Sequence, residues 1–79
     1  MYYVYLLRSK IDGSRYIGQT NDCQERLKRH NSGRVASTKG KKPWDLIKCE
    51  EFTTRSESMW REHILKTNTN ERKKFYGES

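Results

Sequence analysis

Apolar and aromatic residues fall in three short runs that are typical of β-strands. Residues 2–8 are rich in aromatic and β-branched side chains, and residues 14–20 form a second run of this kind after the dipeptide Asp12-Gly13. Residues 45–52 form the third run. The pattern predicts three strands, the first two joined as a hairpin, because Asp-Gly is a strong hairpin signal.

The turn between the first two runs sets which residues face each other. A two-residue type I′ turn places Tyr5 opposite Thr20 and Tyr16 opposite Ser9. Since side chains alternate along a strand, Tyr5 and Tyr16 then point to the same face of the sheet. A three-residue loop would place them on opposite faces.

A first helix is expected after the hairpin. Asn21 is the predicted N-cap, with Gln24 three residues later as its capping-box partner. Cys23 and Leu27 are four residues apart and form the apolar stripe. Gly33 is expected to end the helix.

A second helix is expected between the third strand and the end of the chain. Thr54 and Glu57 have the spacing of a capping box, and the helix is predicted to run to about Lys66. A short last helix is expected over residues 70–76. The predicted apolar face of the second helix consists of Met59, Trp60, His63 and Ile64.

The element order predicts one α+β domain over residues 1–79. A small, three-stranded, mainly antiparallel sheet would be flanked by helices in the order β-β-α-β-α-α. Only 32% of the residues are hydrophobic. The core is therefore expected to be thin and to depend on its aromatic side chains.

The charge of the chain favours a polyanionic partner. Seventeen Lys and Arg against ten Asp and Glu give a formal net charge of +7. Such a balance suits nucleic acid, although it also occurs on merely soluble basic surfaces. The loop of residues 32–43 is basic, and it either grips phosphates or is a solvated connector. Its candidate nucleic-acid-binding residues are Arg34, Lys39, Lys41 and Lys42.

The cysteines and the hydropathy pattern give an expectation for the compartment. Cys23 and Cys49 have no CxxC spacing, and they can form at most one disulfide. Because the chain starts directly with strand-like residues and no signal peptide, we expect both cysteines to be reduced, semi-buried fillers of a cytoplasmic protein. No apolar run reaches the roughly 18 residues of a membrane span, so no membrane is expected.

Five residues form a candidate site for phosphodiester chemistry. Tyr5 and Tyr16 can hold or deprotonate a water if nearby positive charge lowers a phenol pKa. Arg26 offers a planar fork that suits a phosphate, and His30 lies four residues later on the same side of the helix. The carboxylate of Glu62 suits Mg²⁺ that keeps most of its waters.

Each of these residues also has an ordinary structural interpretation. Strand tyrosines are usually packing residues, and Arg26 is the kind of residue found on solvated helix faces. His30 is equally suited to hydrogen bonding at a helix end. Glu62 has the spacing for an i,i+4 pair with Lys66.

Taken together, the motifs resemble those of the GIY-YIG nuclease superfamily. The chain is similar to its small single-domain bacterial members, which are related to the nuclease domain of the excision-repair incision enzyme. The resemblance covers almost the entire chain. The matching stretches are, in order, YVY at 3–5, YIG at 16–18, RLKRHN at 26–31, STKGKKPW at 37–44 and SESMWRE at 56–62.

The resemblance implies a role for each candidate residue. Tyr5 would be a general base or orient the attacking water, and Tyr16 would support the water or the metal shell; which of the two is the base stays open. Arg26 would stabilise the pentavalent phosphate, and His30 would assist proton transfer. Glu62 would be the sole protein ligand of Mg²⁺ or Mn²⁺.

The sequence also departs from the family pattern. Tyr3 stands at the first glycine of the family name, whereas Gly18 is kept and lets the backbone pack closely beneath the active face. Gln19 stands where several repair relatives carry a nearby lysine. The polar residue, often Asn, that follows the metal glutamate in some members has no clear counterpart here. Relatives of known function usually carry a second domain that selects the target, so a protein partner is expected to supply specificity, or selection is loose.

The expected function is metal-dependent hydrolysis of DNA, rather than RNA, phosphodiester bonds. We expect an endonuclease directed by structure or damage, acting in repair or recombination, because no element is left over for direct base readout in the major groove. The alternative is a non-catalytic nucleic-acid-binding module with the same fold. A protein-interaction adaptor is a third, weaker hypothesis, and the oligomeric state stays open.

Overall fold

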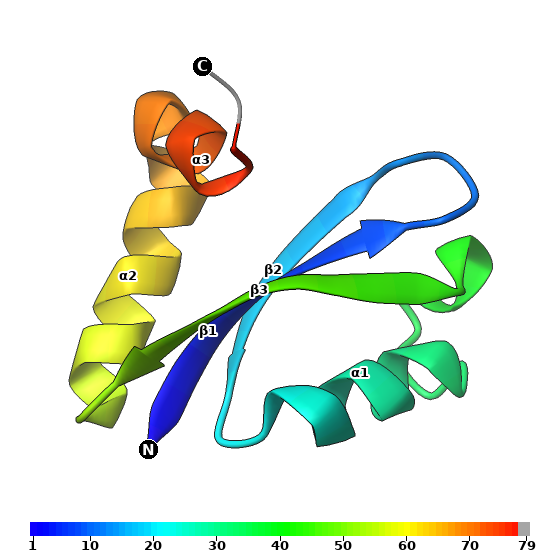
Figure 1. Cartoon of the computed structure of the whole chain (residues 1–79), viewed down its shortest axis with the longest axis horizontal. Helices are drawn as coiled ribbons and strands as arrows, with labels where there is room; N and C mark the ends of the chain where they lie inside the picture. The colour runs from blue at the N-terminus through cyan, green and yellow to red at the C-terminus, as the bar shows by residue number, and fades with distance from the viewer. Residues whose placement is uncertain (78–79) are drawn as a thin grey trace.

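The computed structural model describes residues 1–77 and confirms the predicted order of elements (Figure 1). A short 3₁₀ helix, Lys39–Lys41, precedes the third strand. The strands and α-helices are β1 (Tyr2–Ser9), β2 (Arg15–Thr20), α1 (Cys23–Asn31), β3 (Trp44–Phe52), α2 (Arg55–Thr67) and α3 (Thr69–Phe75).

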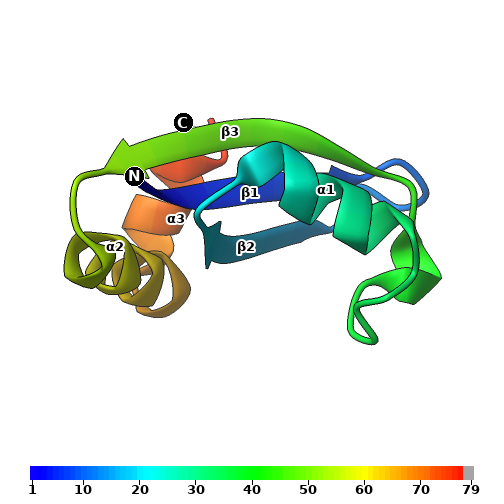
Figure 2. The same ribbon diagram turned by 90° about the horizontal axis from the view of Figure 1, so that it is seen from below.

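The three strands form one antiparallel sheet in the order β2-β1-β3. The first strand is therefore central, and β2 and β3 are both edges. In Figure 2, α1 lies in front of the strands and α3 lies behind them. The architecture is the predicted α+β arrangement, with helices covering both faces of a small sheet. None of the helices in the described part of the chain is long and apolar enough to cross a bilayer.

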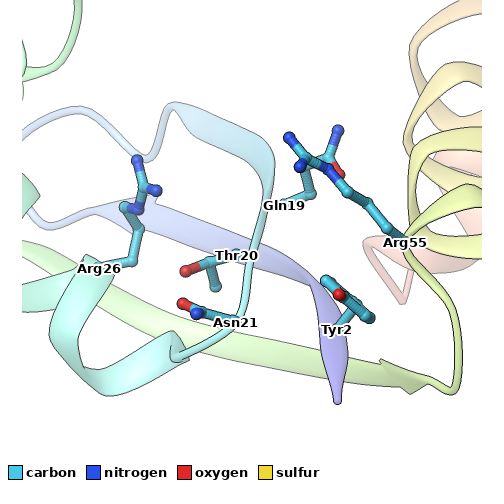
Figure 3. Close-up of a pocket in the computed structure, with 6 residues that line it drawn as sticks. All are labelled: Tyr2, Gln19, Thr20, Asn21, Arg26 and Arg55. Carbon is cyan, nitrogen blue, oxygen red and sulfur yellow. The ribbon is translucent and has the colours of Figure 1, made fainter.

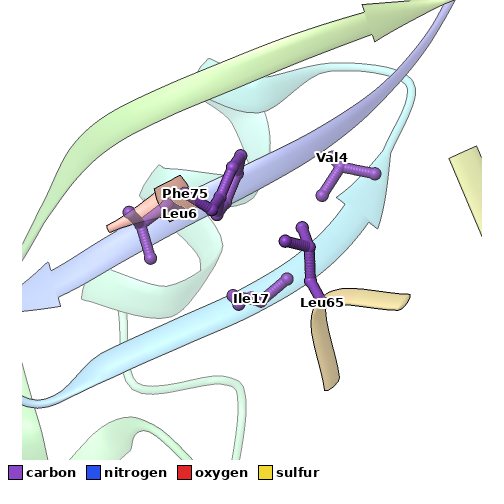
Figure 4. Packing of buried hydrophobic residues seen from close by; sticks show 5 residues of the cluster. All are labelled: Val4, Leu6, Ile17, Leu65 and Phe75. Carbon is purple, nitrogen blue, oxygen red and sulfur yellow. The ribbon is translucent and has the colours of Figure 1, made fainter. Parts of the chain in front are cut away.

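Alternation along β1 divides the apolar core into two layers. Val4 and Leu6 point to the face that α2 and α3 cover, where they pack with Ile17, Leu65 and Phe75 (Figure 4). On the α1 face, the second cluster consists of Tyr5, Leu7, Cys23 and Trp44, with Tyr16 and Leu27 packed against it. The thin core that the composition predicts is thus split between two sides of one sheet.

The hairpin register differs from the predicted one by two residues. Tyr5 faces Gly18 rather than Thr20, and Tyr16 faces Leu7. The chain reverses over residues 10–13, where the Gly13 amide donates to the Ser9 carbonyl at 3.0 Å and Gly13 has φ 75°. The two-residue turn was wrong. A shift of two keeps the alternation, so the prediction that both tyrosines share a face is confirmed.

The polar groups of the turn explain the wider loop. The Ser9 hydroxyl oxygen accepts a hydrogen bond from the Ile11 amide at 3.1 Å, and Asp12 Oδ1 accepts one from the Ser14 amide at 2.9 Å. The two side chains thus provide hydrogen-bond acceptors for amides in and directly after the four-residue loop, which stabilises it relative to a two-residue turn. Asp12 and Gly13 therefore still make the turn, but with two further residues inside it.

The first helix is capped one residue later than predicted. Asp22 is the N-cap, and its Oδ1 accepts from the Glu25 amide at 3.1 Å. Asn21 is left outside the helix, because Thr20 Oγ1 accepts from the Asp22 amide at 3.1 Å and fixes the approach of the chain. The predicted helix end is confirmed, since Gly33 follows the C-cap with φ 81°.

The second helix begins as predicted but is rotated relative to its predicted apolar face. The Thr54–Glu57 capping box is present. Met59 and Trp60 are 50% and 64% exposed, so the predicted face of Met59, Trp60, His63 and Ile64 was wrong. Ser58 and Leu65 are the buried residues instead.

Polar contacts set this rotation. Arg61 Nε donates to Glu50 Oε1 on β3 at 2.9 Å, and Arg61 Nη1 lies 3.4 Å from Glu71 Oε1 on α3. The Arg61 guanidinium also lies over the Phe75 ring, 5.6 Å from its centroid. The helix therefore turns a charged residue towards the sheet, an arrangement that hydrophobic periodicity does not reveal.

Cys23 and Cys49 form a disulfide that joins the start of α1 to β3. The expectation that both cysteines are reduced was wrong in this structure. Cys49 is paired with Tyr5 in the sheet and therefore points to the α1 face, above which Cys23 begins the helix. The sequence separation of 26 concealed this proximity.

Replacing Leu65 with alanine should destabilise the fold, whereas replacing Met59 should not. Leu65 is fully buried in the α2 layer, so Leu65→Ala is expected to cost about 2–5 kcal/mol. Met59→Ala on the exposed side is expected to stay within about 0.5 kcal/mol. Urea unfolding followed by circular dichroism measures both. Equal losses would show that the helix buries a different face.

Candidate functional site

Three aromatic rings meet on the α1 face of the sheet. Tyr5 comes from β1, Tyr16 from β2 and His30 from the last turn of α1. The ring centroids of Tyr5 and Tyr16 are 6.2 Å apart, and the centroid of His30 lies 5.9 Å and 4.9 Å from them. The structure thus brings together three of the residues that the sequence nominated.

A buried chain of hydrogen bonds runs from Tyr5 through His30. Tyr5 Oη lies 3.0 Å from His30 Nε2, and His30 Nδ1 lies 2.8 Å from Thr38 Oγ1. The Thr38 hydroxyl donates its only hydrogen to the Val35 carbonyl at 3.3 Å. Thr38 therefore accepts from Nδ1–H, which leaves Nε2 as the acceptor of the Tyr5 phenol proton.

Thr38 is a site residue that the sequence did not nominate. It is 1% exposed, and its carbonyl accepts from Trp44 Nε1 at 3.0 Å. The basic loop of residues 32–43 is thus anchored at its centre rather than solvated throughout. Only the position of Thr38 inside STKGKKPW, one of the stretches that carry the family resemblance, could have drawn attention to it, because it lies eight positions after His30 and outside the helix.

Burial keeps the tyrosine and the histidine uncharged. Burial raises the pKa of Tyr5, as do Tyr16 and Glu62, and the positive charges of Arg26 and Arg29 offset this only in part. Burial also lowers the pKa of His30, and the charges of Arg26 and Arg29 lower it further. The condition proposed from the sequence, a phenol pKa lowered by nearby cations, is not met at Tyr5.

Gly18 makes room for the Tyr5 side chain. A Cβ atom at this position would lie 2.5 Å from Tyr5 Oη and 2.7 Å from its Cζ. Gly18 faces Tyr5 directly across the hairpin, so the phenol leans over a strand position that must lack a side chain. Close packing at Gly18 was expected of the backbone, whereas the group that packs against it is the side chain of Tyr5.

Glu62 reaches the site from the other face of the sheet. Its Oε1 accepts from Gln19 Nε2 at 3.1 Å, and its Oε2 lies 3.3 Å from Lys66 Nζ. The predicted pair with Lys66 is present, whereas the contact with Gln19 was not anticipated. Gly18 and Gln19 are neighbours on β2 and face opposite sides, so the candidate site wraps around this edge strand.

Arg26 lines a surface hollow and has an unsatisfied donor. Its Nε is buried and finds no hydrogen-bond partner within residues 1–77. A buried N–H without a partner is costly, and a guanidinium in this state suits an anionic ligand. The hollow, of about 350 Å³, is lined by Tyr2, Gln19, Thr20, Asn21, Arg26 and Arg55 (Figure 3).

The acidic groups fit a weakly held divalent cation rather than a caged one. Within the described residues, no three His, Cys, Asp or Glu side chains gather as a ligand cluster. Glu62 supplies one carboxylate, and the side-chain amide of Gln19 lies beside it. Oxygen donors of this kind suit Mg²⁺ or Mn²⁺, which then keep most of their waters.

The loop of residues 32–43 carries the four predicted nucleic-acid-binding residues. Arg34, Lys39, Lys41 and Lys42 are all exposed. Lys41 is held by the hairpin loop, where its Nζ donates to Ser14 Oγ at 3.1 Å and lies 3.7 Å from Asp12. Contact of these four with nucleic acid stays a prediction.

Comparison with known proteins gives a family and a fold. The model of the family described as the GIY-YIG catalytic domain matches residues 1–75. A UPF0213 protein of Bacillus pumilus (strain SAFR-032) is 44% identical over 76 residues, which are 95% of this chain and 76% of that protein. UPF0213 protein YazA of Bacillus subtilis (strain 168) is 40% identical over 76 residues, which are likewise 95% of this chain and 76% of that protein.

A solved structure supports the fold. The solution NMR structure of a UPF0213 protein from Bacillus halodurans matches with a TM-score of 0.58 and 32% identity, covering 98% of this chain and 84% of that one. It confirms the α+β arrangement. The names of these relatives state no activity, so they do not identify a substrate.

The imidazole of His30 should titrate below its usual pKa of 6.5. Because the folded pKa is lowered, the unfolded chain binds more protons between the two values. This part of the stability is complete above the unfolded pKa of about 6.5 and is lost as pH falls from there through the lower folded pKa. NMR titration of the His30 ring, compared with the same ring in urea-unfolded protein, measures the shift. A midpoint at or above the unfolded value would contradict the buried neutral ring.

Proposed function

We propose that this chain, which belongs to the GIY-YIG family of nuclease domains, is an endonuclease. It would hydrolyse DNA phosphodiester bonds with Mg²⁺ or Mn²⁺. The observation that carries the proposal is the hydrogen-bonded chain from Tyr5 to Thr38 beside the unsatisfied guanidinium of Arg26. A proton acceptor and a phosphate ligand are the two protein groups that this reaction needs.

Tyr5 acts as the general base, with His30 as its proton acceptor. As the phenol oxygen takes a proton from the attacking water, its own proton passes to His30 Nε2 at 3.0 Å. The tyrosine thus never has to exist as a free phenolate, which its raised pKa would disfavour. Thr38 accepts from Nδ1–H and stabilises the imidazolium that forms. Tyr16, whose ring lies against both, orients the water.

Arg26 binds the phosphate and stabilises its developing charge. The hydroxide adds to phosphorus, the bond to the leaving oxygen breaks, and that oxygen takes up a proton from solvent. The guanidinium fork can bridge two equatorial oxygens of the pentavalent transition state. In the resting protein its Nε is buried without a hydrogen-bond partner, which costs free energy. A phosphate that accepts from this donor removes that cost.

Glu62 would hold the divalent cation, and Gln19 would orient the carboxylate. When bound, such a cation would supply positive charge for the phosphate and the leaving oxygen. Lys66 Nζ lies 3.3 Å from the carboxylate in the resting state, on a side chain that is 55% exposed. Such a surface pair is weak, so the lysine is readily displaced.

The biological role is part of the proposal. No helix or ribbon of the described residues is left over to enter a major groove, which supports selection by structure or damage during repair or recombination, with a protein partner adding specificity. The choice of DNA over RNA is part of the proposal. A cytoplasmic location stays a prediction, and the Cys23–Cys49 disulfide counts against it because cytosolic thiols are usually kept reduced.

A non-catalytic nucleic-acid-binding module is the second candidate. It is favoured by the occupation of both Glu62 oxygens, one by Gln19 and one by Lys66. Steep salt dependence of DNA binding with no effect of divalent metal, together with no nicking, would support it.

Glu62→Ala and Arg26→Ala should each abolish nicking of plasmid or branched DNA in Mg²⁺ or Mn²⁺. Loss of either the cation site or the phosphate ligand is expected to lower the rate by about 10²-fold or more. Matched controls are Glu51→Gln, on the opposite edge strand, and Arg8→Gln, at the far end of β1. Gel separation of supercoiled and nicked plasmid measures the rates. Wild type and Glu62→Ala with equal rates would rule out the catalytic role.

Tyr5→Phe should lower the rate by about 10²–10⁴-fold while keeping the fold, because only the proton-transferring oxygen is removed. Tyr16→Phe should lower it less, since the proposal gives Tyr16 an orienting role. Single-turnover nicking over a range of pH separates the two. The wild-type rate should fall on the acid side as His30 becomes protonated. A greater loss of rate in Tyr16→Phe than in Tyr5→Phe would indicate that Tyr16 is the general base and Tyr5 the orienting residue.

A further inference from the structure

We infer that the hollow at the carboxyl end of β2 is a subsite for one nucleotide next to the scissile phosphate, with Arg55 as its phosphate ligand and Tyr2 as its stacking surface. The inference rests on the proposed function, because the scissile phosphate at Arg26 sets the position of the neighbouring nucleotide. The hollow joins both faces of the sheet, since Arg26 comes from α1 and Arg55 from α2.

Arg55 is an uncompensated cation on the side of the hollow opposite Arg26. Figure 3 shows its side chain extending from the start of α2 towards Gln19, while Arg26 lies at the other end of the same depression. Within residues 1–77, the Arg55 side chain has no ion pair and no hydrogen bond. By contrast, Arg61 and Lys66 on the same helix both contact carboxylates.

The lining of the hollow contains two guanidinium groups and no carboxylate. One of these, Arg26, has a buried donor that no described residue satisfies. Two cations of this kind around one depression favour an anion with more than one phosphate oxygen to bind, such as two successive phosphates of a strand. Arg55 therefore suits the phosphate next to the one that Arg26 holds.

Tyr2 and Asn21 supply the contacts that a base needs. Tyr2 begins β1, is 37% exposed and lines the hollow, so its ring is available for stacking. Asn21 lines the same hollow, and its side-chain amide makes no hydrogen bond within the described residues, because Asp22 caps α1 in its place. An amide offers both donors and an acceptor to a base edge.

The size of the hollow limits what can enter it. Its volume of about 350 Å³ is at the lower end of the range of about 300–1,000 Å³ found for small-molecule sites. A single nucleotide fits this range. Because a base inside a duplex is stacked on both sides, a base that stacks on Tyr2 must lie outside the helical stack, either flipped or already unpaired. This gives a physical basis for selection by DNA structure without groove readout.

The experiment measures binding and stacking without cleavage. Duplex DNA with one unpaired 2-aminopurine is titrated with full-length protein in EDTA, following anisotropy for affinity and 2-aminopurine emission for stacking. Arg55→Gln should weaken binding and reduce the slope of log K against log salt by about one, as expected for one lost phosphate contact. Arg8→Gln should leave both unchanged.

Aromatic variants test the stacking role. Tyr2→Ala should abolish the quenching of 2-aminopurine, and Tyr2→Phe should keep it. Trp60→Ala is the matched control, because Trp60 is 64% exposed but does not line the hollow. Asn21→Ala should weaken binding with quenching retained, and thermal unfolding checks that each variant is folded.

The possible results separate this inference from the proposed function. Quenching that survives Tyr2→Ala or disappears in Trp60→Ala would overturn the subsite, as would equal effects of Arg55→Gln and Arg8→Gln. If Tyr2→Ala does not fold, the comparison of Arg55→Gln with Arg8→Gln and the binding of Asn21→Ala still test the subsite. Binding with the expected variant effects but no nicking in Mg²⁺ would refute the proposed function and leave the subsite standing. Nicking that is indifferent to Arg55 and Tyr2 would refute the subsite alone.

Discussion

Tyr5 and His30 share a hydrogen bond in a part of the molecule where neither side chain can easily carry a charge. Much of the surrounding structure serves to hold this pair. Gly18 leaves space for the phenol, Thr38 fixes the tautomer of the imidazole, and Trp44 holds the backbone of Thr38. A neutral donor and acceptor at 3.0 Å can exchange a proton without either one being charged at rest.

The charged groups lie around this neutral centre rather than within it. Arg26 and Glu62 approach from opposite faces of the sheet, and β2 passes between them. Because β2 is an edge strand, a ligand can reach both faces around its backbone. The dipeptide Gly18-Gln19 connects the parts of the candidate site on the two faces of the sheet. Gly18 accommodates Tyr5 on one face, and Gln19 contacts Glu62 on the other.

The cations around this edge differ in their partners. Arg61 is tied to Glu50 and Glu71 and fixes the rotation of α2. Arg26 and Arg55 surround a hollow without any acidic lining residue. A protein of net charge +7 has many cations that could meet a polyanion, but these two are positioned around a depression of nucleotide size. A phosphate bound there would satisfy a donor that folding leaves unpaired.

Local sequence patterns were sufficient for the elements and for the shared face of Tyr5 and Tyr16. That inference survived a register error of two residues because alternation depends only on whether the shift is odd or even. The Thr54–Glu57 cap and the helix end at Gly33 were equally local, since their partners lie within one helical turn. The resemblance of the motifs supplied the identities of Arg26, His30 and Glu62 as candidates, but not their surroundings.

Contacts between distant segments decided the rest. The rotation of α2 is one case, since Met59 and Trp60 are exposed because Arg61 contacts Glu50 on β3. The Cys23–Cys49 bond, the anchoring of Thr38 and the contact of Gln19 with Glu62 have the same origin. The cap at Asp22 is an exception, because it depends on the hydrogen bond to Thr20 two residues away. The sequence by itself determined which segments are strands and helices and which residues share a face, because backbone periodicity and capping depend on near neighbours. Only the tertiary structure decided which polar groups are satisfied and which are left for a ligand, because burial and partners come from segments far apart in the chain.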